Sequence, residues 1–198
     1  MSQRCRVAIL ISGRGSNMQA LIEAAKAPDY PAQVIGVFAN DPDAGGLAYA
    51  AEQGIPTAAR SHRDFDSREA FEREIETHLT GWRADLICLA GFMRILSPSF
   101  VGRWQGRILN IHPSLLPAFT GLHTHERALA EGVSEHGCTV HYVTPGLDEG
   151  PPILQARVPV LPGDTAETLA ARVLVEEHRI YPMALAMVAR GEVSRPGG

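Results

Sequence analysis

Residues 7–17 read Val7-Ala8-Ile9-Leu10-Ile11-Ser12-Gly13-Arg14-Gly15-Ser16-Asn17, an apolar run that leads into a short polar loop with two glycines. Apolar residues then recur at helical spacing as far as Ala25, so the pattern predicts a buried strand, a tight loop and a helix. Glycines let a backbone turn sharply and approach a ligand, and the N-terminal end of a helix attracts anions. We therefore expect Gly15, Ser16 and Asn17 to bind a phosphate, with Ser16 or Asn17 capping the helix.

This loop differs from the two common nucleotide-binding loops. A dinucleotide fingerprint would need a third glycine where the chain has Met18, and a P-loop would need Gly-Lys followed by Ser or Thr. A phosphorylated small molecule therefore fits the loop better than NAD or ATP. The alternative is a glycine turn between strand and helix that binds no ligand.

Strand and helix patterns alternate along the rest of the chain. Strands are predicted at residues 33–40, 55–59, 85–90, 107–112, 137–143 and 153–160, and helices at residues 44–53, 68–79 and 126–130. A last helix begins with Asp164 as its N-cap, and Pro182 is expected to kink or end it near Tyr181. The alternation predicts one α/β domain with a mostly parallel sheet.

Composition and charge exclude several classes of protein. Of the 198 residues, 45% are hydrophobic and 20% are charged, and the formal net charge is -4, with no run of Lys or Arg. We therefore expect neither a nucleic acid nor a membrane as the main partner. The first apolar run is too short for a signal peptide or a membrane span, which favours a cytoplasmic protein. Three distant cysteines, Cys5, Cys88 and Cys138, indicate no disulfide framework and no thiolate metal site.

Two polar side chains close the predicted strand at residues 107–112. Side chains alternate along a strand, so Asn110 and His112 point to the same side. An amide can donate to an oxygen that gains negative charge, and an imidazole can give or take a proton near neutral pH. This pair therefore predicts a catalytic site, and the alternative is a polar strand end that meets solvent.

Other candidates follow strand ends or break a local pattern. The segment Met93 to Leu96 comes just after the strand at residues 85–90, where α/β sheets bind ligands, although it could be ordinary core filling. Asp148 lies in a Gly- and Pro-rich loop; a carboxylate beside an imidazole favours its protonated form, but Asp is also a common turn residue. Glu177 falls on the apolar face of the last helix, where a carboxylate must be paired or used, and it is a candidate for binding an amine or for reaching solvent at the helix edge.

Two further features have weaker signals. Arg68 lies in the first turn of a predicted helix, where a cation opposes the helix dipole, which hints at a ligand. His112, His123 and His125 raise the question of a metal, but no His-Glu-x-x-His or comparable pattern occurs. We expect no metal site.

Five motifs occur together: Ser12-Gly13-Arg14-Gly15-Ser16-Asn17, Ala90-Gly91-Phe92-Met93-Arg94-Ile95-Leu96, Asn110-Ile111-His112-Pro113-Ser114-Leu115-Leu116-Pro117, Gly121-Leu122-His123-Thr124-His125 and Leu147-Asp148-Glu149-Gly150. They resemble the folate-dependent formyltransferases, and within them the phosphoribosylglycinamide formyltransferase branch. The similarity extends from about Val7 to Met187.

The resemblance implies a fold, an activity and partners. The fold would be a single Rossmann-like domain, residues 1–198, whose mostly parallel twisted sheet is flanked by helices and has antiparallel strands toward the C-terminal part. Residues 1–105 would form a phosphate-binding half and residues 106–190 a folate-binding and catalytic half, with a frayed tail at 191–198. The activity would be transfer of the formyl group of 10-formyltetrahydrofolate to the amine of glycinamide ribonucleotide. No metal and no covalent enzyme intermediate are implied, and the protein would be a monomer or a homodimer.

The resemblance also assigns roles to residues. Asn110 and His112 would stabilise the oxyanion, and Asp148 would support His112 and help to move the proton. The backbone of Gly15, Ser16 and Asn17 would hold the phosphate, and Glu177 would contact the amine end of the substrate. The residues that would hold the formylfolate are Arg68, Met93, Arg94, Ile95, Leu96, Asn110, Thr144, Pro145, Gly146, Leu147 and Asp148.

Three other functions are compatible with parts of the pattern. Methionyl-tRNA formyltransferase would need a further C-terminal domain, and formyltetrahydrofolate hydrolase would need a further N-terminal one. A non-catalytic phosphosugar-binding module would keep the fold alone. Two positions depart from the family pattern: Leu174 stands where a polar residue near the substrate is expected, and Thr120 stands in place of a proline.

Overall fold

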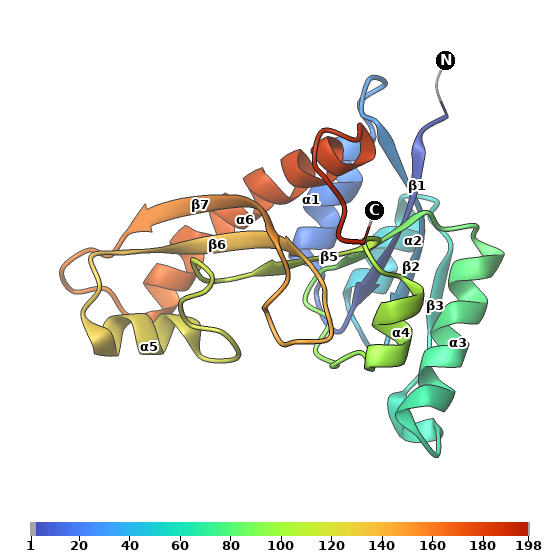
Figure 1. Ribbon diagram of the computed structural model, residues 1–198, viewed down its shortest axis with the longest axis horizontal. Coiled ribbons are helices and arrows are strands. Elements are labelled where there is room, and N and C mark those ends of the chain that lie inside the picture. Colours follow the sequence, from blue (N-terminus) through green and yellow to red (C-terminus); the bar gives the residue numbers. More distant parts are fainter. Residues whose placement is uncertain (1–2, 198) are drawn as a thin grey trace.

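The computed structural model describes residues 3–197 and contains a seven-stranded sheet in the order β3-β2-β1-β4-β5-β6-β7 (Figure 1). The strands are β1 (Cys5–Ile11), β2 (Ala32–Ala39), β3 (Thr57–Ala59), β4 (Leu86–Leu89), β5 (Ile108–His112), β6 (Glu135–Tyr142) and β7 (Pro152–Pro159). The pairs from β3 to β5 are parallel, and β6 and β7 are antiparallel to their neighbours. The predicted α/β fold with antiparallel C-terminal strands is therefore confirmed.

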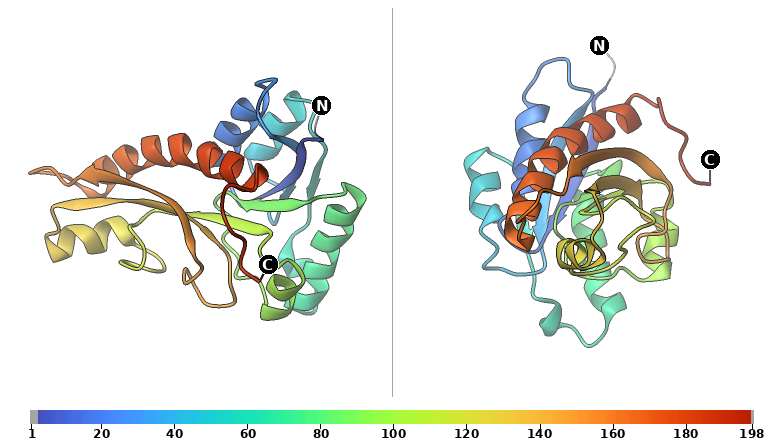
Figure 2. Two further views of the ribbon diagram at one scale, coloured as in Figure 1. Left: turned by 45° about the horizontal axis from the view of Figure 1, so that its top comes forward. Right: turned by 90° about the vertical axis from the view of Figure 1, so that its left-hand side faces the viewer.

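Helices cover both faces of this sheet. They are α1 (Ser16–Ala25), α2 (Gly46–Glu52), α3 (Arg68–Gly81), α4 (Pro98–Arg103), α5 (Thr124–Glu131) and α6 (Ala166–Ala189), with a short 3-10 helix at His62–Asp64. Both views in Figure 2 show α1 and α6 side by side, and they pack against each other. Within the described residues, no helix combines the length and the hydrophobicity that a membrane span requires.

Alternation along β1 explains why the sheet has two cores. Val7, Ile9 and Ile11 are fully buried in the core that contains α1, α2 and α6. Ala8 and Leu10 are buried in the second core, with α3 and α4. Successive side chains point to opposite faces of a strand, so a strand with a helical layer on each face must be apolar at every position. The continuous apolar run that opened the sequence is thus the centre of the molecule.

The expected N-cap of the last helix is wrong, and so is one of the two alternatives for Pro182, that it ends the helix. Its N-cap is Thr165 instead of Asp164, because Thr165 and Thr168 exchange side chain and backbone hydrogen bonds. Asp164 accepts from Arg172 at 2.7 and 2.8 Å instead. Pro182 does not end the helix, which continues to Ala189. The turns after Pro182 bury Ala184, Leu185 and Val188, and this apolar burial outweighs the missing backbone hydrogen bond.

The end of the chain returns to the sheet after α6 (Figure 1). Arg195 and Pro196 lie against Gly106, where an added Cβ atom would come 2.8 Å from the Pro196 carbonyl oxygen. The tail predicted at residues 191–198 is thus described as far as residue 197, and residue 198 lies outside the described residues. All three cysteines are free, with Cys88 and Cys138 buried and Cys5 half-buried.

Candidate active site

Three segments that follow parallel strands meet at one edge of the sheet. Ser12 follows β1, Gly91 follows β4, and His112 ends β5, which are neighbouring strands. The Ser12 N-H donates to the Gly91 carbonyl at 3.1 Å, which joins the first two segments directly. The carboxyl ends of neighbouring parallel strands are where α/β folds bind their ligands. The loop after β1, the segment after β4 and His112 therefore lie at one edge of the sheet.

The loop after β1 leaves the start of α1 open. Gly15 is the N-cap residue, in a left-handed conformation with φ 68°, and no side chain among residues 3–197 caps the helix. The expectation that Ser16 or Asn17 caps α1 is therefore wrong. The first N-H groups of a helix have no partners within the helix, and here no side chain in the described part of the protein satisfies them. The loop thus keeps free backbone donors and the positive end of the helix dipole for an anion.

Glu177 and Asn17 are brought together although 160 residues separate them. The Asn17 Nδ2 atom donates to Glu177 Oε2 at 3.2 Å, and both residues are 8% exposed. Burial raises the pKa of Glu177 to about 7, while the hydrogen bond from Asn17 acts in the opposite direction. The buried Asn17 Oδ1 atom has no hydrogen-bond partner among the described residues. Buried polar groups normally have partners, so this pair at the start of α1 can still bind a polar ligand.

Replacing Glu177 by glutamine is expected to stabilise the protein more at pH 8 than at pH 5. Because the pKa of Glu177 in the folded chain, about 7, lies above its ordinary value of 4.5, the folded state binds more protons between these two pH values. The free energy of unfolding therefore falls as pH rises through this window. The extra gain of the variant at pH 8 should be about 1–3 kcal/mol, from roughly 1.4 kcal/mol per pKa unit reduced for residual solvation.

Urea denaturation of both proteins at pH 5 and pH 8 measures this difference. Glu52→Gln, which changes an exposed glutamate at the end of α2, is the control and should show the same small effect at both pH values. An effect of Glu177→Gln that is equal at pH 5 and pH 8 would contradict the burial argument.

Asn110 is held by a residue that the sequence did not identify. Asn110 pairs with His141 across β5 and β6, and the Asn110 Nδ2 atom lies 3.3 Å from His141 Nε2. The other ring nitrogen of His141 lies 2.9 Å from the Tyr142 carbonyl oxygen, which can only accept, so His141 Nδ1 carries the hydrogen. Burial lowers the pKa of His141, so the ring is neutral and its Nε2 accepts from Asn110. This fixes the amide and leaves its second N-H for a ligand.

His112 is oriented by two acceptors. Its Nε2 atom lies 2.8 Å from the Phe119 carbonyl oxygen and therefore donates to it. Its Nδ1 atom faces Asp148 Oδ2 at 3.5 Å, which is longer than a usual hydrogen bond but within ion-pair distance of an imidazolium. The side chains of His112 and Asp148 are each 8% exposed. The predicted proximity of these two residues is therefore present, and the proton that can move is the one on Nδ1.

The Asp148 carboxylate is aimed by its own turn. Asp148 has φ 55°, a left-handed conformation that Asp tolerates better than most residues, and its Oδ2 atom accepts from the Gly121 N-H at 2.9 Å. Its Oδ1 atom lies 3.9 Å from His141 Nε2. The turn-forming and functional interpretations of Asp148 are thus compatible, because the turn brings the carboxylate to both histidines.

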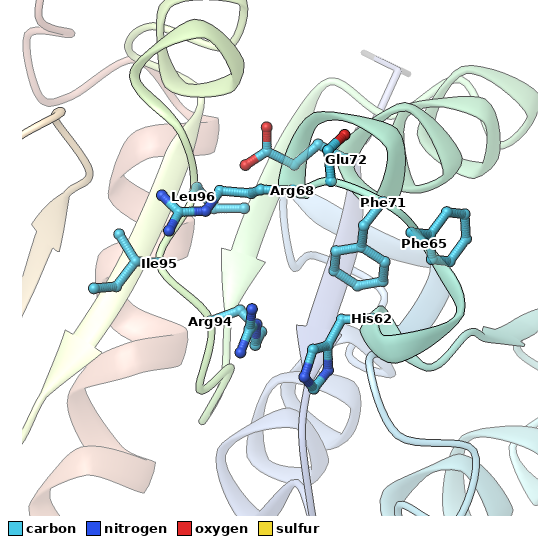
Figure 3. Close-up of a pocket in the computed structure, with 9 residues that line it drawn as sticks. His62, Phe65, Arg68, Phe71, Glu72, Arg94, Ile95 and Leu96 are labelled. Carbon is cyan, nitrogen blue, oxygen red and sulfur yellow. The ribbon is translucent and has the colours of Figure 1, made fainter.

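A pocket of about 250 Å³ lies between α3 and the segment after β4 (Figure 3). Arg68, Arg94, Ile95 and Leu96, four of the residues predicted to hold formylfolate, line it together with residues that the sequence did not indicate: His62, Phe65, Ser67, Phe71 and Glu72. Within residues 3–197 neither guanidinium group forms an ion pair. Two free cations beside aromatic rings suit a ligand that has both anionic groups and an aromatic part.

The other residues predicted to hold formylfolate lie outside this pocket. Met93 has an exposed side chain, at 66%. Thr144, Pro145, Gly146 and Leu147 belong to the loop between β6 and β7. Asp148 of this loop accepts from the Gly121 N-H, and Leu147 lies near Gly121. A ligand would have to bridge the pocket and this loop to contact both.

The histidines near the site show no arrangement for a metal. His123 is 74% exposed, and His125 is paired with His136, whose Nε2 atom lies 3.2 Å from His125 Nδ1. Burial lowers the pKa of His136 to about 4, so this pair is neutral at physiological pH. Across residues 3–197, no group of three or more His, Cys, Asp and Glu side chains could hold a metal ion.

The motifs that form this site can be compared with known proteins. The model of the family described as formyl transferase matches residues 5–185. The chain belongs to the formyl transferase family. The match includes every segment of the site, from the loop after β1 to Glu177 in α6.

Similar proteins are known for this formyl transferase in sequence and in structure. Phosphoribosylglycinamide formyltransferase of Escherichia coli is 50% identical over 187 residues, which cover 94% of this chain and 88% of that protein. The crystal structure of phosphoribosylglycinamide formyltransferase from Brucella melitensis has a TM-score of 0.92 at 57% identity and covers 98% of this chain and 100% of that one. The trifunctional purine biosynthetic protein adenosine-3 of Drosophila pseudoobscura pseudoobscura is 53% identical over 194 residues. This match covers 97% of this chain but 14% of that protein.

Proposed function

We propose that this formyl transferase moves the formyl group of 10-formyltetrahydrofolate to the amine of glycinamide ribonucleotide, as a step of purine synthesis. One observation carries the proposal: a fixed amide N-H and an imidazole backed by a carboxylate stand side by side at the end of β5. The uncapped N-terminus of α1 follows β1, and the pocket that contains the guanidinium groups of Arg68 and Arg94, unpaired among residues 3–197, lies beside the segment after β4. The names of relatives that are 50% and 57% identical support the same reaction.

The chemistry would begin with attack of the substrate amine on the formyl carbon. A new C-N bond forms and the carbonyl oxygen becomes an oxyanion, which accepts the free N-H of Asn110 and is stabilised by the imidazolium of His112. The Asp148 carboxylate stabilises that imidazolium across 3.5 Å and helps to carry the proton that leaves the amine. The bond between the formyl carbon and N10 of the folate then breaks, and N10 takes up the proton.

The substrate would bind at the start of α1. Its phosphate would accept the free N-H groups of Gly15, Ser16 and Asn17. Glu177 contacts Asn17, so it would meet the substrate close to the phosphate. The ribose hydroxyls lie closer to the phosphate than the amine does, and we propose them as the groups that Glu177 binds, in place of the amine that its sequence position suggested.

The folate would lie between the pocket and the loop before Asp148. Arg68 and Arg94 would bind its carboxylates, while the pterin ring would lie against the backbone from Met93 to Leu96. The loop from Thr144 to Leu147 would cover the ligand from the other side. In this arrangement residues 1–105 hold the phosphate and residues 106–190 supply the catalytic groups, although Arg68 and the segment after β4 also come from the first half. We place the protein in the cytoplasm, as a monomer or a homodimer.

Incubation with glycinamide ribonucleotide and 10-formyltetrahydrofolate carrying ¹³C in its formyl group tests this function. Mass spectrometry should find the labelled formyl group on the ribonucleotide and an equal amount of tetrahydrofolate. Binding of the ribonucleotide without any formylated product would favour a non-catalytic phosphosugar-binding module, which is the second candidate because the phosphate loop alone would support it.

A further inference from the structure

The segment from Met93 to Leu96 has an unusual backbone. It follows β4 through Gly91 and ends at Ser97, the N-cap of α4. Within residues 3–197, the backbone N-H and C=O groups of Arg94, Ile95 and Leu96 form no hydrogen bond with the protein. A segment with free backbone donors and acceptors can form hydrogen bonds with a flat heterocyclic ligand. Its conformation is not fixed by backbone hydrogen bonds to a neighbouring strand.

One end of the segment is fixed by Ser12. The Ser12 Oγ atom accepts from the Met93 N-H at 2.7 Å and donates to Asn40 Oδ1 at 2.5 Å. Ser12 follows β1 directly, and Asn40 follows β2 and is 8% exposed. The Ser12 hydroxyl group therefore links Met93, the first residue of the segment, to the ends of β1 and β2.

The other end is fixed by Glu72. This glutamate of α3 is 2% exposed, and both of its carboxylate oxygens bind Ser97: Oε1 accepts the backbone N-H at 2.6 Å and Oε2 accepts the hydroxyl at 2.5 Å. A buried carboxylate is costly unless hydrogen bonds compensate for its lost hydration. Here both compensating bonds go to the residue that ends the segment, and the Ser97 hydroxyl also caps α4 by accepting from the Phe100 N-H at 3.2 Å.

We propose that Ser12 and Glu72 are positioning residues that hold the segment Met93 to Leu96 at its two ends and so preorganise it for the pterin of formylfolate. The inference rests on the proposed function. A segment that is already ordered loses less conformational entropy when the ligand binds. Neither side chain contacts Asn110, His112 or Asp148 by a hydrogen bond or an ion pair, so loosening the segment weakens folate binding and leaves the chemical step intact.

Calorimetric titration with tetrahydrofolate tests the proposal without requiring turnover. Ser12→Ala and Ser97→Ala each remove the two hydrogen bonds of a hydroxyl group, one of which holds an end of the segment, and each should raise the Kd for tetrahydrofolate about tenfold. Glu72→Gln places a side-chain amide N-H against a hydrogen-bond donor of Ser97. This variant should raise the Kd for tetrahydrofolate at least as much. Ser97→Thr keeps the hydroxyl and should restore wild-type affinity. Ser99→Ala, which changes an exposed serine two residues further along in α4, is the matched control.

Kinetics separate positioning from a merely structural role. The KM for formylfolate should rise in the Ser12, Glu72 and Ser97 variants, while the KM for the ribonucleotide and kcat at saturating folate stay within about threefold of wild type. Equal loss of affinity for both ligands, or unchanged affinity for tetrahydrofolate in all three variants, would overturn the proposal. A wild-type protein that binds no tetrahydrofolate would overturn the proposed function and this inference together, whereas equal binding by wild type and variants overturns this inference alone.

Discussion

Replacing His112 by alanine is expected to lower kcat about a thousandfold while leaving the Kd for tetrahydrofolate within a factor of two. The size of this decrease in kcat follows from the usual contribution of a positioned acid or base to the rate, about 10²–10⁴-fold. The imidazole is 2.8 Å from one fixed acceptor and 3.5 Å from another, and the alanine side chain leaves neither an acid nor a base in its place. The loss should therefore fall on the chemical step and not on binding.

Steady-state and single-turnover rates, with calorimetry for binding, measure this effect. His78→Gln is the control, because His78 lies at the end of α3, beside Glu74 and Trp82 and away from the site. It should keep wild-type kcat. Turnover by His112→Ala at more than about a tenth of the wild-type rate would remove His112 from the mechanism.

Replacing Asp148 by asparagine should lower kcat by about 10²–10³, because the charge that supports the His112 imidazolium is lost. The backbone should be unaffected, since Asn adopts the left-handed conformation at φ 55° as readily as Asp and its side-chain oxygen can still accept from Gly121. Asp148→Asn therefore isolates the charge from the turn.

The neighbouring acid provides the control for this variant. Glu149→Gln changes an exposed residue of the same loop and should retain nearly full activity. Thermal unfolding of both variants should match wild type within a few degrees. If Asp148→Asn kept wild-type kcat with its fold intact, Asp148 would be a turn residue only.

Local patterns predicted the α/β class and the pairing of Asn110 and His112 on one side of a strand, whereas the antiparallel C-terminal strands were expected from the family resemblance alone. The apolar run of β1 predicted a buried strand, because a strand covered by helices on both faces needs apolar side chains on both. The alternation of side chains along β5 placed Asn110 and His112 on one side of that strand. The continuation of the last helix beyond Pro182 was not predicted, because local propensity was weighed without the apolar surface that the following turns bury. Asp164 was misjudged because Arg172, eight residues away, competes for its carboxylate.

Contacts between distant segments could not be predicted. His141 supports Asn110 only because β6 pairs with β5 in one register, and a shift of one residue would turn its ring to the other face. The Phe119 carbonyl that orients His112, and Glu72 that holds Ser97, depend on how loops return to the sheet. One signal in the sequence could have indicated His141: it is a titratable residue within an otherwise apolar stretch, Val140 to Val143.

The central claim is that the formyl group passes from the folate to the amine without a free intermediate. Measuring the release of tetrahydrofolate with and without glycinamide ribonucleotide tests this claim most directly. We predict that tetrahydrofolate forms only when the ribonucleotide is present, in a one-to-one ratio with the formylated product and without free formate. Formate released from 10-formyltetrahydrofolate at a comparable rate in the absence of the ribonucleotide would contradict the account, because water and not the amine would then be the acceptor.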